Sequence, residues 1–137
     1  MPLISTKGVY GLTAMYELSK HEDDTPLQIK EISSSAKIPQ NYLEQLLSKL
    51  RHAGLVKSIR GAKGGYILAK KPEDIIVKDI LIALEGDLKI IDNKTENPIL
   101  NMFFSEAKEN TKKIFELSLA QLDDYQDKYN EVLHYSI

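Results

Sequence analysis

The spacing of apolar residues changes from a helical to a strand period at Gly54, and this change constrains the fold more than any other feature. From Pro39 to Ala53 apolar residues recur at intervals of three and four, as on one face of a helix. Residues 55–60 then alternate apolar and polar, a Gly-rich turn covers Gly61–Gly65, and a second apolar run covers residues 66–69. The pattern predicts a helix followed directly by a β-hairpin.

Two further helices are expected before this unit. The first covers residues 6–20, with Ser5 or Thr6 as its N-cap, and is apolar on nearly every face, which favours burial against a partner chain. The second is short and covers residues 26–36, because Thr25–Gln28 has a capping residue, a proline at the first helical position and a glutamine three residues on. Two short helices and a hairpin predict a winged helix-turn-helix, closed by a helix near residues 77–84.

The C-terminal part predicts a different kind of element. Residues 87–103 read as a linker or loop, with a short strand as an option near Ile90 and Ile91, and residues 104–137 as one long helix without Gly or Pro. A helix of roughly 30 residues spans about 45 Å, which is too long for so small a domain to cover. We therefore expect a mainly α fold: a DNA-binding domain of residues 1–86 with a β-hairpin wing, and a C-terminal helix that forms a homodimer. Its expected dimer residues are Phe104, Ile114, Phe115, Leu119, Leu122, Tyr125 and Tyr129.

Charge is distributed unevenly along the chain. Residues 1–71 carry 11 Lys or Arg against 6 Asp or Glu, a net charge of +5, whereas residues 72–137 carry 7 against 14, a net charge of −7. Within Lys37–Lys71 the count is 8 basic residues against Glu44 alone. A basic segment opposite an acidic half indicates a surface that faces a polyanion such as DNA.

Several classes of function are disfavoured by what the sequence lacks. It has no cysteine, which removes disulfides, zinc–thiolate sites and cysteine-held iron–sulfur clusters, and His21, His52 and His134 match no metal-ligand spacing. No apolar stretch is long enough to cross a bilayer and the start of the chain does not resemble a signal peptide, so a cytoplasmic location is expected. No nucleophile has a nearby base and acid, and Gly61–Gly65 lacks the context of a phosphate-binding loop. We expect neither an enzyme nor a cofactor.

Four segments together resemble one family closely. They are ISTKGVYGLTAM (residues 4–15), NYLEQL (41–46), LRHAGLVKSIRGAKGGY (50–66) and DILIALEG (79–86). They are similar to the bacterial Rrf2 family of winged-helix transcriptional regulators, which includes the IscR, NsrR and CymR branches. The resemblance implies a homodimer on a palindromic operator, with long helices crossing between subunits, that acts by repression or, less often, by activation.

The resemblance also separates branches of the family. Members with an iron–sulfur cluster carry three cysteines in the loop after the Leu-Glu-Gly segment, and the corresponding residues 87–101 contain none. A regulator independent of a cluster is therefore expected. CymR-like members also lack the cluster, and resemblance to them implies control by a partner enzyme of cysteine metabolism. The alternative hypothesis is accordingly an interaction module that controls, or is controlled by, such an enzyme.

Candidate DNA contacts fall in two places. Gln40, Asn41, Glu44 and Gln45 start the third helix, where amide and carboxylate groups can read base edges in the major groove. The Tyr42 ring is expected to pack on the domain while its hydroxyl reaches a phosphate, and packing in the core alone is the alternative. The wing supplies Arg60 and Lys63, with Gly61, Gly64 and Gly65 expected to let its backbone approach the duplex and adopt positive φ. Further phosphate contacts are expected from Lys7, Lys57 and Ser58. The leading hypothesis is a sequence-specific repressor modulated by a protein or small-molecule effector.

Overall fold

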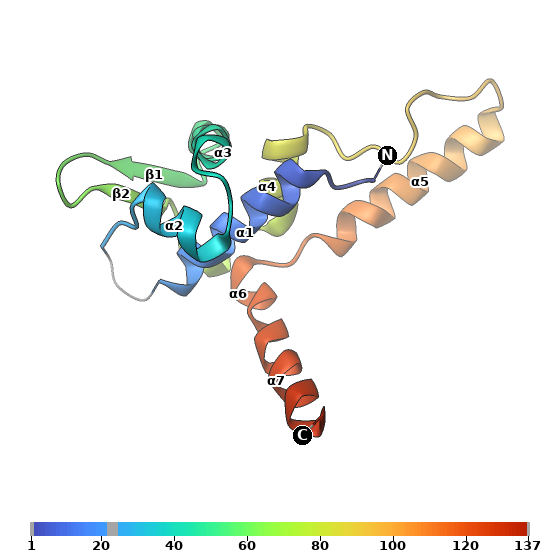
Figure 1. Cartoon of the computed structure of the whole chain (residues 1–137). Helices are drawn as coiled ribbons and strands as arrows, with labels where there is room; N and C mark the ends of the chain where they lie inside the picture. Colours follow the sequence, from blue (N-terminus) through green and yellow to red (C-terminus); the bar gives the residue numbers. More distant parts are fainter. Residues whose placement is uncertain (1, 22–24, 137) are drawn as a thin grey trace.

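The computed structural model describes residues 2–21 and 25–136, and its first part is a winged helix-turn-helix (Figure 1). Three helices precede a two-stranded antiparallel sheet, and a 3₁₀ turn and a fourth helix follow it. These elements are α1 (Thr6–Lys20), α2 (Ile29–Ala36), α3 (Gln40–His52), β1 (Val56–Ile59), β2 (Gly65–Leu68), η1 (Pro72–Asp74) and α4 (Val77–Glu85). The expected fold class, mainly α with a small hairpin wing, is confirmed.

The core lies where α1, α3 and α4 meet. Ala14 and Met15 of α1, Leu43 and Leu47 of α3 and Ile80 of α4 are fully buried. The helical spacing of the α3 leucines places them all on the inner side of this helix, while its polar residues face outward. α1 lies close against α4 because Gly11 has no side chain: a Cβ there would stand 2.1 Å from the Leu84 Cδ1 atom.

The hairpin is extended by one residue from before α2. β1 pairs with β2 from Val56 opposite Leu68 to Ile59 opposite Gly65, and Leu27 forms an isolated bridge with Tyr66 on the other edge of β2. The Leu27 N–H donates to the Tyr66 carbonyl at 3.0 Å, and the Tyr66 N–H donates to the Leu27 carbonyl at 2.7 Å. Satisfying these backbone groups across the sheet fixes the wing relative to the start of α2.

This bridge corrects the expected start of the second helix. The proline signal at residues 25–28 predicts a helix from Pro26, but α2 begins at Ile29. Gln28 is its N-cap, and the Gln28 N–H donates to the Glu31 Oε1 atom at 3.3 Å. Leu27 is extended because the sheet uses both of its backbone groups, so a pairing distant in sequence overrides the local signal.

The single long C-terminal helix is also corrected. The structure has three helices there, α5 (Pro98–Ile114), α6 (Leu119–Leu122) and α7 (Asp124–Ser136). The break occurs because residues 115–118 pair with the start of α4: the Val77 N–H donates to the Leu117 carbonyl at 2.8 Å and the Lys78 N–H to the Phe115 carbonyl at 2.7 Å. These bonds satisfy N–H groups that the first turn of α4 leaves without helical partners. α5 and α7 therefore project in different directions (Figure 1).

The expected linker of residues 87–103 is shorter than predicted. α5 begins at Pro98, with the Asn97 side chain accepting from the N–H groups of Ile99 and Leu100. No strand forms in residues 87–97, all of which the structure describes. Within residues 2–21 and 25–136, none of the helices combines the length and apolar character needed to span a bilayer.

Candidate DNA-binding interface and dimer surface

The start of α3 presents a polar face to solvent. Gln40, Asn41, Glu44 and Gln45 are all exposed, whereas Leu43 between them is fully buried. The helical period separates the two sets, because the buried residues lie on the side of α3 that faces α1 and α4. The structure thus brings the four predicted base-reading residues together on the outward side of the second helix of the helix-turn-helix.

Tyr42 has a packing role in the free protein. Its ring contacts the ring of Tyr10 of α1 edge to face, with centroids 5.6 Å apart, and the residue is half-buried. Such a contact favours one orientation of the ring. Both interpretations of Tyr42 place its ring against the domain, and the contact of its hydroxyl with a phosphate stays a prediction.

The wing carries exposed basic residues next to α3. Lys57, Ser58, Arg60, Gly61 and Lys63 are all exposed, on β1 and the turn that follows it. Two wing glycines instead serve the hairpin itself. Gly64 is buried, and a Cβ there would stand 2.1 Å from the Ile59 carbonyl oxygen. Gly65 has φ of 151°, and a Cβ there would stand 2.3 Å from the Leu27 carbonyl oxygen, so these two positions shape the wing rather than present a surface.

The remaining predicted phosphate contact, Lys7, lies apart from the wing. It is half-buried in the first turn of α1, at the end of the winged helix that is farther from the hairpin (Figure 1). A basic residue that the sequence reasoning did not single out, Lys37, ends α2 in the left-handed conformation with φ of 57° and is exposed in the turn before α3. Its signal was its position in the turn of the helix-turn-helix, where a left-handed residue is common.

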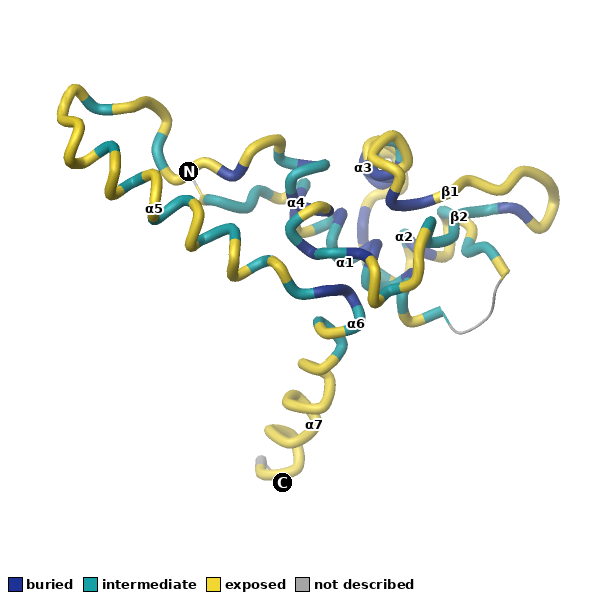
Figure 2. The backbone as a smooth tube through the Cα atoms, turned by 180° about the vertical axis from the view of Figure 1, so that it is seen from behind, coloured by how far each residue is buried: buried dark blue, intermediate teal, exposed yellow. Residues whose placement is uncertain are grey.

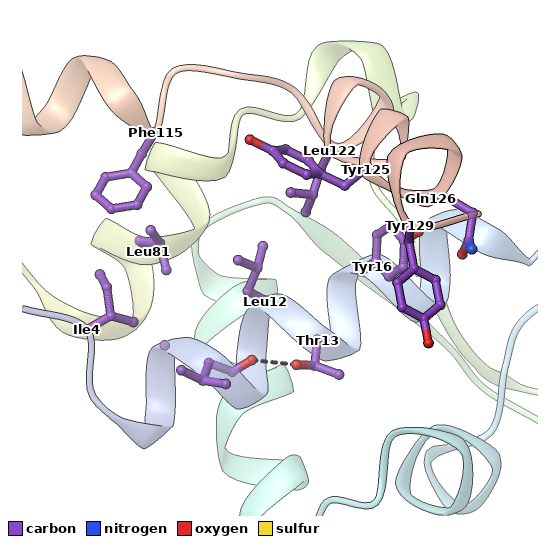
Figure 3. Close-up of a pocket in the computed structure, with 12 residues that line it drawn as sticks. Ile4, Leu12, Thr13, Tyr16, Leu81, Phe115, Leu122, Tyr125, Gln126 and Tyr129 are labelled. Carbon is purple, nitrogen blue, oxygen red and sulfur yellow. Dashed lines mark hydrogen bonds between the residues drawn. The ribbon is translucent and has the colours of Figure 1, made fainter. Parts of the chain in front are cut away.

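A second surface is an apolar groove between α1, α4 and the C-terminal helices. The cavity has a volume of about 460 Å³. Figure 3 shows Leu12 and Tyr16 of α1, Leu81 of α4 and Tyr125 and Tyr129 of α7 around it. A groove so apolar on an accessible face is typical of a protein–protein contact.

One polar cluster holds the groove's two long walls together. The Tyr16 hydroxyl donates to the Asp123 Oδ1 atom at 2.7 Å, and the Lys20 ammonium lies 2.8 Å from the same oxygen. Hydrogen bonds from Lys20 and Tyr16 hold the pKa of Asp123 below its usual range, and burial together with the Asp123 carboxylate raises the pKa of Tyr16. Asp123, between α6 and α7, is thereby fixed to α1.

α5 carries an exposed apolar stripe of its own. Ile114 is 71% exposed, Phe103 is 60% exposed, and Ile99 and Leu100 at the start of the helix are exposed as well. Residues 99, 103 and 114 lie on one side of a helix with 3.6 residues per turn, and Asn110 is a polar residue on the same side. Sequence reasoning missed Ile99, Leu100 and Phe103, whose signal was the Asn97-Pro98 start of a helix six residues earlier than expected.

The predicted dimer residues divide into two groups. Ile114, Tyr125 and Tyr129 are exposed and available to a partner. Leu119 is fully buried in the core of its own chain, and Phe104, Phe115 and Leu122 are half-buried, the last two packing against a small cluster around Val77 and Leu81. Leu119 is therefore removed from the candidate dimer surface, because its side chain has no face left for a second chain.

The segment that joins α4 to α5 does not suit an iron centre. The sequence has no cysteine, and among the described residues no three His, Cys, Asp or Glu side chains stand close enough to share a metal ion. Asp87, the first residue after the Gly86 C-cap of α4, is instead paired with Lys108 at 2.5 Å and Lys112 at 3.1 Å. These two ammonium groups lower the pKa of Asp87 to about 2.

Comparison with known proteins gives consistent matches. The family model Rrf2, described as an iron-dependent transcriptional regulator, matches residues 4–133. The transcriptional regulator CymR of Bacillus subtilis is 40% identical over 136 residues, which cover 98% of this chain and 99% of the relative. IscR of Photorhabdus laumondii is 40% identical over 82 residues, so the chain matches about half the length of that relative.

Comparison with solved structures gives the same two kinds of regulator, CymR and IscR. The structure of CymR, the global cysteine regulator of B. subtilis, superposes with a TM-score of 0.81 and 40% identity over 91% of this chain and 98% of that one. IscR of T. potens superposes with a TM-score of 0.77 and 39% identity, over 91% of this chain and 89% of that one. The relatives are transcriptional regulators and not enzymes. From the family match over most of the chain, the polar start of α3 and the basic wing, we conclude that this protein belongs to the Rrf2 family of DNA-binding transcriptional regulators.

Proposed function

We propose that the chain represses transcription as a homodimer that occupies a palindromic operator. The observation that carries the proposal is the exposed polar start of α3 together with the exposed basic residues of the hairpin whose first strand follows α3 (Figure 1). α3 enters the major groove with Asn41, Glu44 and Gln45 at base edges, and Arg60 and Lys63 of the wing follow the adjacent phosphates or minor groove.

The dimer accounts for two apolar surfaces that one chain leaves uncovered. α5, with its apolar stripe, and α7, which lines the apolar groove, project apart, and much of both helices is exposed (Figure 2). A second copy of the chain can cover the α5 stripe and the apolar groove at the same time, because a two-fold axis places the same surfaces of both chains against each other. Two winged helices related by that axis match two half-sites related by the same symmetry.

The operator proposal is tested with DNA from upstream of the chain's own gene. Binding measured by fluorescence anisotropy between 50 and 200 mM salt is expected to fall linearly on a log–log plot, as phosphate contacts require. A footprint with two symmetric halves is expected. Asn41→Ala is expected to lose about 1–3 kcal/mol per half-site of the preference for the operator over random DNA. Lys63→Ala is expected to weaken binding to every DNA sequence alike. Equal affinity for operator and random DNA would contradict the proposal.

The proposed regulator does not use a cysteine-ligated cluster as its signal. The side chains that could ligate a cluster support this proposal. The sequence contains no cysteine thiolate, and the Asp87 carboxylate already pairs with two lysines. The match to B. subtilis CymR extends through the C-terminal half, whereas the match to IscR of P. laumondii covers only 82 residues.

That full-length match supports a second proposal, that the regulated genes serve cysteine metabolism, as named for that relative. Deleting the gene is expected to raise transcripts of cysteine uptake and synthesis under cysteine-rich growth. RNA sequencing checks this, and unchanged levels of those transcripts would contradict it. Purifying the tagged chain from the same cultures tests the alternative of a partner enzyme.

A further inference from the structure

We propose that the cavity between residues 89–94 and α5 binds a small organic anion with an apolar portion. As an effector site it rests on the proposed function, but binding itself requires neither DNA nor a dimer. The cavity has a volume of about 290 Å³. The loop and the helix α5 that line it lie on the side of the molecule away from the wing (Figure 1).

The cavity exists because the loop above it is tied to α5 at both ends. At one end Asp87 pairs with Lys108 and Lys112. At the other, the Thr95 N–H donates to the Asn101 Oδ1 atom at 2.8 Å, and the Asn101 Nδ2 atom donates to the Thr95 carbonyl at 2.9 Å. Because both ends are fixed, residues 89–94 pass over α5 and leave the cavity between the loop and the helix.

The lining of this space specifies the class of ligand. Lys89, Lys94 and Lys108 contribute three cations, against the single carboxylate of Asp92. A surplus of ammonium groups favours an anion by direct Coulomb attraction. The apolar lining residues are Ile90, Ile91 and Phe104.

The size of the cavity restricts the ligand further. Pockets for small molecules commonly begin at about 300 Å³, so this one suits a compact metabolite rather than a nucleotide or a peptide. Carboxylate and phosphate heads share the required charge, and both occur on metabolites of this size. An anionic head on a short apolar body therefore fits the charge, the walls and the volume together.

Lys108 links the cavity to the position of α5. The same side chain lines the cavity and pairs with Asp87, which lies two residues after the last residue of α4. A bound anion competes with the Asp87 carboxylate for Lys108. Binding therefore weakens one of the ties between α4 and the helix that carries the exposed apolar stripe.

The test titrates the ¹⁵N-labelled full-length chain with three probes that share a phenyl ring: phenylacetate, phenyl phosphate and neutral phenylacetamide. The two anions are expected to shift amide signals of residues 89–94 and 101–108, and phenylacetamide is expected to bind at least about tenfold more weakly. Whichever anion binds more tightly identifies the preferred head group. Equal binding of all three probes, or anion-induced shifts confined to the wing, would overturn the proposal.

Matched variants locate the anion. Lys94→Gln and Lys108→Gln are each expected to weaken phenylacetate binding about fivefold, as for loss of a partly exposed ion pair. Lys113→Gln, on the same helix but outside this cavity, serves as the control and keeps wild-type affinity. If Lys108→Gln fails to fold, Lys94→Gln still tests the site, because Lys94 is exposed in the loop of residues 89–94 and its loss is not expected to disturb folding. Unchanged affinity in both cavity variants would exclude this site.

The link to Asp87 has its own readout. Bound phenylacetate is expected to raise the pKa of the Asp87 carboxyl from about 2 toward 3.8, since Lys108 is then shared. Carbon-detected NMR of the side-chain carboxyl measures this without DNA. Failure of the operator experiments would leave this result unaffected, whereas an unchanged Asp87 pKa at saturation would refute the competition for Lys108.

Discussion

The Glu85 carboxylate of α4 caps the first turn of α1 at Ser5. Its Oε1 atom accepts from the Ser5 N–H at 3.1 Å, from the Ser5 hydroxyl and from the Gly8 N–H at 3.0 Å. Ser5 is the N-cap residue by position, but its side chain makes no capping bond within its own helix. A residue 80 positions away therefore satisfies the N–H groups at the start of α1, where a negative charge also complements the helix dipole.

Glu85→Ala is expected to lower the free energy of unfolding by about 1–2 kcal/mol, because it removes this cap and leaves N–H groups of the first turn without their partner. Glu85→Gln keeps one acceptor oxygen and is expected to lose less. Urea denaturation measures both, with the exposed Glu73→Ala of η1 as the control, expected within ~0.5 kcal/mol of wild type. A wild-type midpoint for Glu85→Ala would show that the cap contributes nothing.

Arg60→Ala is expected to weaken operator binding while leaving thermal stability unchanged, because the residue is exposed on the wing. The slope of log affinity against log salt is expected to fall by about one unit per subunit. Lys113→Ala, which removes one positive charge on α5, controls for the change in net charge. Equal affinities for the wild type and Arg60→Ala in a titration would refute the wing assignment.

Ile114→Asp is expected to dissociate the proposed dimer without unfolding the chain. The side chain is 71% exposed in one chain, so a carboxylate is tolerated in the monomer but costs several kcal/mol if a partner buries it. Light scattering and circular dichroism separate the two effects. Operator affinity is expected to fall steeply with the loss of the second half-site.

Two comparisons sharpen the dimer experiment. Glu109→Lys changes the charge of an exposed residue that stands about 140° around the same helix, and it is expected to remain dimeric. Leu122→Asp is less informative, since Leu122 is half-buried against its own chain and its loss destabilises the monomer as well. A folded, dimeric Ile114→Asp would exclude the α5 stripe from the interface.

Asp87 is expected to make the junction of α4 and α5 sensitive to acid. Hydrogen bonds from Lys108 and Lys112 lower its pKa from 3.8 to about 2. A depressed pKa in the folded state means that the stabilisation is complete above pH 3.8 and is lost as the pH falls through about 2. Thermal unfolding of Asp87→Asn and wild type is expected to differ at pH 6 and to converge near pH 2.

The same titration has an internal control. Asp92 lies in the same loop as Asp87 but takes no part in the two ion pairs with α5. At pH 6 the unfolding temperature of Asp92→Asn is therefore expected to differ less from wild type than that of Asp87→Asn. The Asp87 effect is also expected to shrink in 1 M salt, because the pairs are partly exposed. An Asp87 pKa near 3.8 by NMR would disprove the pairing in solution.

Protein purified without oxygen is expected to be colourless and to contain no stoichiometric iron. The reason is the lack of any thiolate among its 137 residues, although the family is described as iron-dependent. Iron analysis and a visible spectrum check this expectation. A charge-transfer band with matching iron would require ligands that the sequence does not offer.

The parts that the sequence determined are those whose signals are local. The spacing of leucines in residues 39–53 predicts the buried side of α3, and the change of period at Gly54 predicts the wing. Gly65 in the turn is a further local signal, because a glycine can adopt its φ of 151° at little energetic cost. The exposed residues at the start of α3 follow from the same period, because polar side chains on a half-buried helix lie opposite its apolar ones.

Tertiary structure decided where helices begin and end when distant backbone groups compete with local signals. Leu27 is extended because Tyr66 pairs with it, and the expected C-terminal helix breaks because the Phe115 and Leu117 carbonyls accept from the start of α4. One local signal of that break was present: Ser118 and Gln121 form a capping box, with bonds of 3.1 and 2.9 Å. The break buries Leu119 and exposes Ile114, so only the fold decides which apolar residues of one continuous-looking pattern remain for a partner. A hydrophobic period identifies the apolar residues of a helix, but burial depends on which elements pack against it, and that is set by contacts between residues far apart in the chain.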